Sequence, residues 1–348
     1  MYREIELGPI RPPSEAGSLL LRVTRNCPWN KCRFCTLYRG ERFSTRPVEE
    51  IKADIDQLAF YRDQGVLNWP AFGTGSVFLQ DANTMVLTAD KLREILVYLR
   101  EKLPEVQRVT AYGRVDSLAK FSAEQLKSLK EAGLDRIHSG YESGSDKVLT
   151  LINKGYTKAQ EIEAGQKVKA SGIEFSVYYM PGVGGKELSD ENAVETADVV
   201  NQIDPDYVRI RTFVSKHGTE LMDDIDAGRM AECSDWEKAL ELKKLIESIH
   251  GAGGRLYSDH IVNLFGEING SLTTDKEKML SVFEAFERLD ARDRRRYQLA
   301  RRLGGVSSLY HFSKLEDDEL ARLDKYLSQL ESDEELEAFM LRRLRRYI

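Results

Sequence analysis

Short apolar runs alternate with amphipathic segments between residues 18 and 215 of the chain. Six runs have the continuous apolar or β-branched character of buried parallel strands: Leu19–Thr24, Val77–Leu79, Arg108–Tyr112, Arg136–Tyr141, Glu174–Tyr179 and Tyr207–Phe213. The segments between them have helical periodicity; after Pro47, for example, Ile51, Ile55 and Leu58 share one face. The pattern predicts an α/β fold in which right-handed crossovers place helices outside a parallel sheet.

The number of repeats and the later change of pattern predict how the chain is organised. Six βα units are fewer than the eight of a closed barrel, so we expect a partial (β/α)6 TIM-like barrel. After residue 230 the pattern changes to helical periodicity and a highly charged tail. We therefore expect an N-terminal segment at 1–17, the barrel at 18–230 and a mainly helical C-terminal extension at 231–348.

Three of the four cysteines lie within nine residues, in the loop that leaves the first predicted strand. In a parallel α/β layer this loop lies at the active-site edge. The thiolates of Cys27, Cys32 and Cys35 can fill three iron positions of a [4Fe–4S] cluster and leave one iron open. A tetrahedral zinc site is the alternative, but Cys233 or a histidine would have to supply the fourth ligand. Cys233 on its own is expected to be a buried small apolar residue.

The cysteine triad after the first strand, the aromatic Phe34 before the last cysteine, and the six βα units together resemble the radical S-adenosylmethionine (SAM) superfamily. The segment GLDRIHSGYESGSDKVLTLINKG is similar to the iron–sulfur oxidoreductase branch related to the methylthiotransferases. The resemblance covers about residues 18–225. The chain departs from the family's Cys-x3-Cys-x2-Cys pattern, because Pro28–Lys31 makes the first spacing four residues long.

The resemblance implies an enzyme with one [4Fe–4S] cluster whose open iron binds the methionine part of SAM. An electron from a flavodoxin or ferredoxin then cleaves SAM, and the 5′-deoxyadenosyl radical abstracts hydrogen from a substrate. Cys27, Cys32 and Cys35 would hold the cluster. The chain has too few cysteines for a second cluster and shows no cobalamin-binding domain before the barrel. We therefore expect a single-cluster enzyme.

Residues at the ends of the early strands are candidates for the SAM site. The resemblance assigns Asp81 to the SAM ammonium, with Asn83 supporting the turn; the alternative is an Asx turn that caps the strand. Tyr112 and Arg114 end the third strand, and Arg114 can meet a SAM or substrate carboxylate or can be an ordinary surface arginine. The resemblance also implies that Phe34, between the last two cysteines, lies beside the cofactor.

Residues at the ends of the later strands complete this set of candidates. Glu142 ends the fourth strand, and its carboxylate can bind the SAM ribose hydroxyls or the methionine ammonium. The backbone at Met180 is a plausible adenine contact, because the glycines that follow allow close approach. Arg209 and Arg211 alternate to one face of the sixth strand, where either can reach the SAM carboxylate or an acidic substrate.

A polar cluster follows an apolar run in the C-terminal part: Ser258, Asp259, His260 and Asn263. One interpretation is that this segment returns to the barrel mouth and helps to form the substrate pocket. His260 would then exchange protons with the substrate near neutral pH. The alternative is a hydrogen-bonded structural turn.

Charge and hydropathy narrow the classes of partner. The 348 residues contain 51 Lys and Arg against 57 Asp and Glu, a net charge of −6, so the whole chain lacks the footprint of a nucleic-acid binder. We therefore favour a small-molecule substrate over RNA and expect Arg292–Arg296 to be a solvated helix face.

No run reaches the roughly 18 apolar residues of a membrane span, and the start lacks a signal peptide. We expect a cytoplasmic protein; a zinc-stapled, non-catalytic barrel and an RNA-modifying enzyme are the alternatives.

Overall fold

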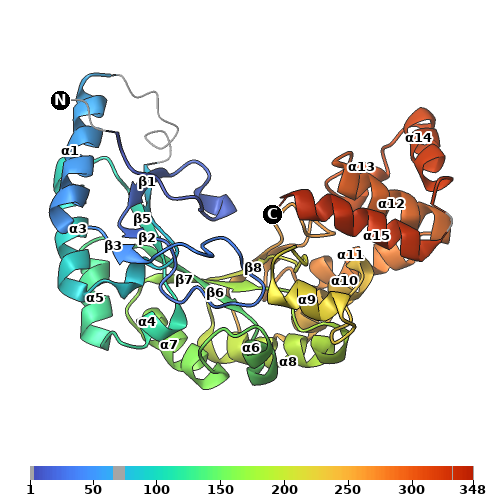
Figure 1. Ribbon diagram of the computed structural model, residues 1–348, viewed down its shortest axis with the longest axis horizontal. Coiled ribbons are helices and arrows are strands. Elements are labelled where there is room, and N and C mark those ends of the chain that lie inside the picture. The colour runs from blue at the N-terminus through green and yellow to red at the C-terminus, as the bar shows by residue number, and fades with distance from the viewer. Residues whose placement is uncertain (1–3, 66–74, 331, 348) are drawn as a thin grey trace. The chain divides into compact units, whose positions relative to one another are not determined.

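The computed structural model describes residues 4–65, 75–330 and 332–347 (Figure 1). Its main sheet has the strand order β1-β4-β5-β6-β7-β8-β9-β10. The strands are β1 (Leu19–Arg22), β4 (Ser76–Gln80), β5 (Arg108–Tyr112), β6 (Arg136–Glu142), β7 (Glu174–Tyr179), β8 (Tyr207–Ile210), β9 (Arg255–Tyr257) and β10 (Asn269–Ser271). A separate pair is formed by β2 (Thr24–Arg25) and β3 (Ser44–Thr45). The pairs β1/β4, β4/β5, β5/β6 and β8/β9 are parallel, and β9/β10 is antiparallel.

Helices follow the strands in the order expected of βα units. They are α1 (Val48–Asp63), α3 (Ala89–Lys102), α4 (Val115–Leu118), α5 (Ala123–Glu131), α6 (Asp146–Leu151), α7 (Lys158–Ala170), α8 (Ser189–Ile203), α9 (Glu220–Asp226), α10 (Asp235–Ser248), α11 (Lys276–Glu287), α12 (Ala291–Leu303), α13 (Leu309–Phe312), α14 (Asp317–Leu327) and α15 (Asp333–Leu344). The mostly parallel sheet with its helices confirms the predicted α/β, partial-barrel class with a helical C-terminal extension. No helix in the described part of the chain is long and apolar enough to cross a membrane.

All six predicted strands are present, but two end earlier than expected. The first predicted run splits, because β1 ends at Arg22 and Thr24 turns away to pair with Thr45 of β3. β8 ends at Ile210 because the Asn263 side chain takes over the next backbone groups: it donates to the Ile210 carbonyl at 2.8 Å and accepts from the Thr212 amide at 2.9 Å. Long-range side-chain contacts therefore end a run that is apolar in sequence.

The chain falls into two compact units, each with its own core. The first contains residues 1–141 and 155–177, and the second contains residues 142–154 and 178–348. In the first unit, buried Leu21 and Phe78 from the sheet belong to a core that also contains Ile51 and Ile55 of α1. In the second, Phe265 stacks on Tyr297 with ring centroids 5.8 Å apart. The candidate residues are divided between the two units, so each set is described within its own unit.

Candidate active site

The three clustered cysteines lie in the loop between β2 and β3 of the first unit, and each is a partly exposed free thiol. The loop folds back on itself, because the Asn30 amide donates to Cys27 Sγ at 3.4 Å and the Cys35 amide donates to the Cys32 carbonyl at 3.2 Å. Asn30 has φ +48°, a left-handed conformation that asparagine tolerates better than most residues. The four-residue spacing is therefore accommodated by a tight turn.

Two asparagine side chains tie this loop to its own far end. Asn26, with φ +66°, donates from Nδ2 to the Arg42 carbonyl at 2.8 Å. Asn30 Nδ2 donates to the Tyr38 carbonyl at 2.6 Å. Because these bonds span 16 and 8 residues, they hold the cysteine segment between two fixed points.

Asp81, directly after β4, joins the two ends of the loop. Its buried carboxylate accepts from Arg22 Nη2 at 2.9 Å, from the Asn26 amide at 3.4 Å and from the Tyr38 hydroxyl. Burial and the Asp81 carboxylate raise the pKa of Tyr38, so the phenol stays protonated and donates. Both oxygens of the residue expected at the SAM ammonium are therefore bonded within the chain, on either side of the cysteines.

Arg114, after β5, lies between two aromatic rings. Its guanidinium carbon is 5.5 Å from the ring centroid of Trp29, within the cysteine loop, and 5.5 Å from that of Tyr156. Nε donates to Asp116 at 2.9 Å. Burial alone would lower the pKa of Arg114, but Tyr156, Asp116 and the thiols Cys32 and Cys27 reverse this and raise it. Arg114 is therefore a fixed positive charge whose field reaches two of the three cysteines.

The remaining candidates of the first unit support this arrangement. Asn83 is buried and donates from Nδ2 to Ser117 at 2.8 Å, while its Oδ1 accepts from the Arg114 amide at 3.1 Å. It thereby holds the turn that presents Arg114. The Tyr112 ring meets Phe78 edge to face at 5.1 Å, and Phe34 is half-buried between Cys32 and Cys35.

In the second unit, Glu142 forms a buried ion pair at the end of β6. Its Oε1 lies 3.0 Å from Lys154 Nζ, and its carbonyl accepts from the Met180 amide at 2.9 Å. Glu142 has φ +67°, an uncommon conformation for a residue with a Cβ, which costs roughly 1 kcal/mol. This geometry fixes a charged pair directly where the strand ends.

The loop that begins at Met180 is held by Glu241 of α10. The Glu241 carboxylate accepts from Tyr179 Oη at 2.6 Å, Ser189 Oγ at 2.7 Å, Asn192 Nδ2 at 2.7 Å and the Gly182 amide at 3.0 Å. Burial raises the pKa of Glu241 to about 7, and the four donors limit that rise. The backbone after Met180 is therefore fixed by a side chain far along the sequence.

Arg209, Arg211 and His260 lie together at the ends of β8 and β9. Arg209 Nη1 lies 2.5 Å from Asp259 Oδ2, and its guanidinium is 5.1 Å from the Tyr257 ring centroid. His260 follows Asp259, and its Nδ1 accepts from the Val262 amide at 3.3 Å. Burial and the nearby Arg211 lower the pKa of His260 to about 4, so its imidazole is neutral at pH 7.

Five residues that shape these sites were not singled out from sequence: Trp29, Tyr38, Lys154, Tyr156 and Glu241. The sequence held a signal for two of them, Trp29 and Tyr156, both in the first unit. Trp29 lies inside the lengthened cysteine spacing. Tyr156 follows Gly155, which has φ +86° and whose lack of a side chain leaves room for the Trp29 ring. The sequence held no such signal for Lys154 and Glu241, because the residues that they contact are known only from the folded structure.

The described residues contain no group of three or more His, Cys, Asp or Glu side chains placed to hold a single metal ion. The sequence model of the Radical SAM superfamily matches residues 21–200, just over half of the chain, and includes all three clustered cysteines. The chain belongs to the radical SAM superfamily. It is therefore a radical SAM enzyme, a class that uses a [4Fe–4S] cluster and SAM.

The chain is similar to several curated proteins and solved structures. An uncharacterized methyltransferase of Pyrococcus horikoshii is 26% identical over 66% of this chain and 47% of its own length. A tRNA-2-methylthio-N6-dimethylallyladenosine synthase of Syntrophus aciditrophicus is 28% identical over 58% of this chain and 42% of its own. The radical SAM chain thus spans about half the length of these curated relatives. The crystal structure of methylornithine synthase aligns with a TM-score of 0.44 at 18% identity, covering 67% of this chain and 63% of that one.

The residues of this radical SAM protein fit such a cluster. Three partly exposed thiols in one loop are the donor set that leaves one iron of a cubane open. Arg114 supplies positive charge toward Cys27 and Cys32, which suits thiolates. Cys233, by contrast, is buried in the second unit, where burial raises the pKa of its thiol to about 12.

Proposed function

We propose that Cys27, Cys32 and Cys35 bind one [4Fe–4S] cluster and that the protein uses it to remove hydrogen from an anionic small molecule. When bound, the cluster supplies the electron that cleaves SAM to a 5′-deoxyadenosyl radical. The observation that carries the proposal is the three-thiol loop, fixed at both ends by Asp81, Asn26 and Asn30.

The candidate residues of each unit have their own roles in this proposal. Asp81 holds the loop, because Arg22 and Tyr38 engage its two oxygens, and its remaining acceptor capacity suits the SAM ammonium. Arg114 is held in place by its two aromatic neighbours and Asp116, and it offers a positive charge to a carboxylate. Glu142, paired with Lys154, offers the acidic group for the SAM ammonium or ribose. The backbone at Met180 is the proposed adenine contact, kept rigid by Glu241.

The cluster assignment is tested by anaerobic reconstitution with iron and sulfide. We expect about four iron ions per chain in the wild-type protein and an electron paramagnetic resonance signal after reduction. Replacing Cys27, Cys32 and Cys35 by alanine should abolish both. Cys233→Ala is the matched control and should retain both, because that thiol is buried in the second unit. Stoichiometric zinc without iron would support the zinc-stapled alternative and contradict the proposal.

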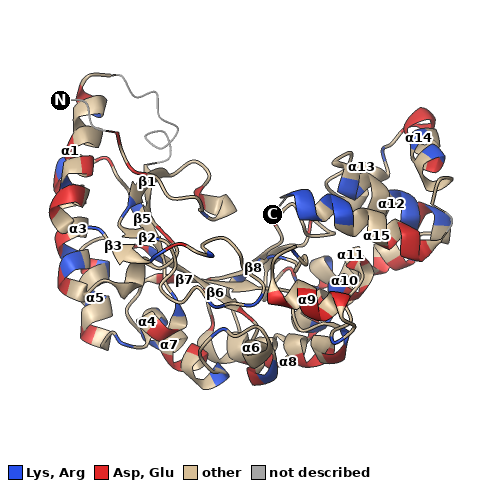
Figure 2. Cartoon of the chain, viewed as in Figure 1, with Lys and Arg blue, Asp and Glu red and all other residues tan. Residues whose placement is uncertain are grey.

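RNA is the second candidate substrate, because several relatives are named as tRNA-modifying synthases. Those names remove the argument that an acidic whole-chain charge makes nucleic acid unlikely. The basic segment of α12 is weak support for an RNA substrate, because Figure 2 shows acidic residues among the basic ones on α12, α14 and α15. Arg292 and Arg296 share the Asp324 carboxylate, and Arg302 pairs with buried Asp235 at 2.7 Å.

Salt-dependent binding separates the two substrate classes. A filter-binding titration with unmodified tRNA should show no specific binding if the substrate is small. Affinity that falls steeply as salt rises would indicate released counterions and phosphate contacts. Such a result would favour the RNA candidate.

The electron donor is proposed to be a flavodoxin or ferredoxin, which a reconstituted reduction assay can examine separately.

A further inference from the structure

The charged residues at the ends of β8 and β9 form a cluster distinct from the cysteine loop. We use the name arginine cluster for Tyr178, Arg209, Arg211, Asp259 and His260. All five belong to the second unit, and they come from the ends of β7 and β8 and from the segment after β9. Tyr178 interacts electrostatically with both arginines and with Asp259, and His260 interacts with Arg211 and Asp259.

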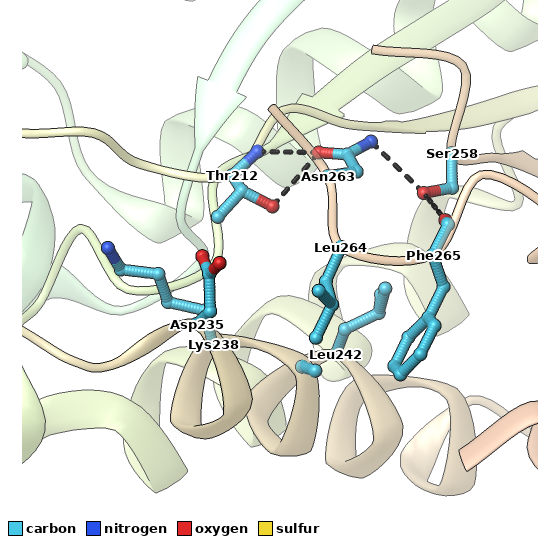
Figure 3. Close-up of a pocket in the computed structure, with 9 residues that line it drawn as sticks. Thr212, Asp235, Lys238, Leu242, Ser258, Asn263, Leu264 and Phe265 are labelled. Carbon is cyan, nitrogen blue, oxygen red and sulfur yellow. Dashed lines mark hydrogen bonds between the residues drawn. The ribbon is translucent and has the colours of Figure 1, made fainter. Parts of the chain in front are cut away.

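A hydrogen-bond network next to the cluster fixes the segment that carries Asp259 and His260. Figure 3 shows Asn263 bonded to both the backbone amide and the hydroxyl of Thr212, each at 2.9 Å, and to Ser258 Oγ at 3.0 Å. Ser258 Oγ in turn donates to the Phe265 carbonyl at 2.7 Å. These bonds attach residues 258–265 to the end of β8. The predicted polar segment therefore divides: Ser258 and Asn263 are structural, and Asp259 and His260 meet the arginines.

The two arginines of the cluster differ in whether an acidic side chain neutralises their charge. Arg209 is buried, is neutralised by Asp259 at 2.5 Å, and lies against the rings of Tyr257 and Tyr207 at 5.1 and 5.8 Å. Arg211 is partly exposed, and its backbone amide donates to the Tyr179 carbonyl at 3.0 Å. Within residues 4–65, 75–330 and 332–347, no carboxylate lies within ion-pair distance of its guanidinium.

No other group of the cluster cancels the charge of Arg211. His260 is neutral at pH 7. Glu142, which acts electrostatically on Tyr178 of the cluster, is itself paired with Lys154. A planar guanidinium that keeps its charge and has donors available binds carboxylates and phosphates in a bidentate manner. The net positive charge of the cluster therefore selects an oxyanion.

We propose that Arg211, with His260 beside it, binds a carboxylate or phosphate group of a small substrate, while Arg209 and Asp259 form the fixed support of that subsite. Calling the ligand a substrate rests on the proposed radical SAM function. The subsite itself stands on the geometry of the second unit alone. Arg211 is thus a specificity-determining residue, and His260 is a hydrogen-bonding partner in its neutral form.

Chemical labelling of arginine tests this subsite without requiring SAM cleavage. The full-length, cluster-loaded protein is treated anaerobically with phenylglyoxal, and each modified arginine is quantified by peptide mass spectrometry. We expect Arg211 to react readily and Arg209 slowly, because Arg209 is buried and paired. A millimolar dissociation constant predicts that about 50 mM inorganic phosphate slows the labelling of Arg211 about fivefold or more relative to potassium chloride of equal ionic strength.

Controls within the chain separate a subsite from a general salt effect. Arg288 is largely exposed on α11 and pairs with Glu284, so phosphate should not protect it more than chloride does. Equal labelling of Arg211 in phosphate and chloride would overturn the proposal. Protection by SAM but not by phosphate would also overturn it, since the occupant would then be the SAM carboxylate. A protein that shows phosphate protection but never cleaves SAM would retain the anion subsite and lose the proposed function, so the two failures are distinguishable.

Discussion

The Trp29 indole occupies the space that a side chain at Gly155 would need. A Cβ atom built on Gly155 would lie 2.4 Å from Cζ2 and 2.6 Å from Cη2 of Trp29. Trp29 belongs to the lengthened segment between Cys27 and Cys32, and its ring also contacts the Arg114 guanidinium. The contact joins the cysteine loop to the chain just before α7, so the altered cysteine spacing is supported by a packed aromatic ring.

Gly155→Ala should therefore displace Trp29 and impair cluster binding. We expect a changed tryptophan emission spectrum and fewer iron ions per chain after reconstitution. Gly172→Ala is the matched control, because Gly172 has a similar φ of +79° but no atoms within 4 Å of the added Cβ. Both variants incur the roughly 1–2 kcal/mol cost of a left-handed alanine. Equal iron content in the two variants would contradict the supporting role of Trp29.

Asp81→Asn should loosen the cysteine loop as well as destabilise the fold. The substitution breaks the buried pair with Arg22 and weakens the bond from Tyr38, at a cost of about 3 kcal/mol in the free energy of unfolding. Asp235→Asn breaks a comparable buried pair with Arg302, at 2.7 Å, in the second unit. Urea denaturation should show similar losses for both, whereas iron content should fall only for Asp81→Asn. If cluster loading fell equally, the specific role of Asp81 would be wrong.

Lys154→Met should weaken SAM binding. Removing the ammonium leaves the Glu142 carboxylate buried without its counter-charge, which changes its position. We expect equilibrium dialysis to show about a tenfold lower affinity for SAM, which corresponds to about 1.4 kcal/mol. Lys147→Met, a change on the neighbouring helix α6, removes an exposed pair with Glu191 of α8 and should leave the affinity unchanged. Unaltered SAM binding in Lys154→Met would argue against Glu142 as a SAM contact.

The buried Glu241 should make stability depend on pH. Its pKa is raised from 4.5 to about 7, so the folded state holds a proton that the unfolded state has lost. The resulting contribution is fully present below pH 4.5, is lost as pH rises through about 7, and amounts to about 3 kcal/mol at most. Denaturation of Glu241→Gln at pH 6 and pH 8 should show a smaller difference than the wild-type protein. Glu247→Gln, an exposed change on the same helix, should keep the full difference.

Local signals in the sequence predicted much of the fold. The strand bounds of β5 and β7 agree with the apolar runs. Capping boxes at Ser122 and Thr157 begin α5 and α7, and each depends only on residues three apart in the sequence. By contrast, the sequence pattern did not predict β9 and β10. These strands are three residues long, and β9 joins the sheet by pairing with β8, which lies far from it in the sequence.

The sequence allowed candidate site residues to be selected, but it could not show their hydrogen-bond and ion-pair partners. Asp81 and Glu142 were selected because they stand at strand ends that the family resemblance implies belong to the cofactor site. Their partners Tyr38 and Lys154 come from other segments, so sequence could not show that Asp81 is bonded on both oxygens or that Glu142 is ion-paired. His260 was expected to titrate near neutral pH, but its burial beside Arg211 was not visible in the sequence.

The central claim is that the three clustered cysteines support reductive cleavage of SAM. The most direct measurement is the amount of 5′-deoxyadenosine formed by reconstituted protein with SAM and dithionite under anaerobic conditions, quantified by mass spectrometry. The account predicts the nucleoside from the wild-type protein and from Cys233→Ala, and none from the variant with alanine at Cys27, Cys32 and Cys35. A wild-type protein that carries a complete cluster, binds SAM and forms no 5′-deoxyadenosine would contradict it.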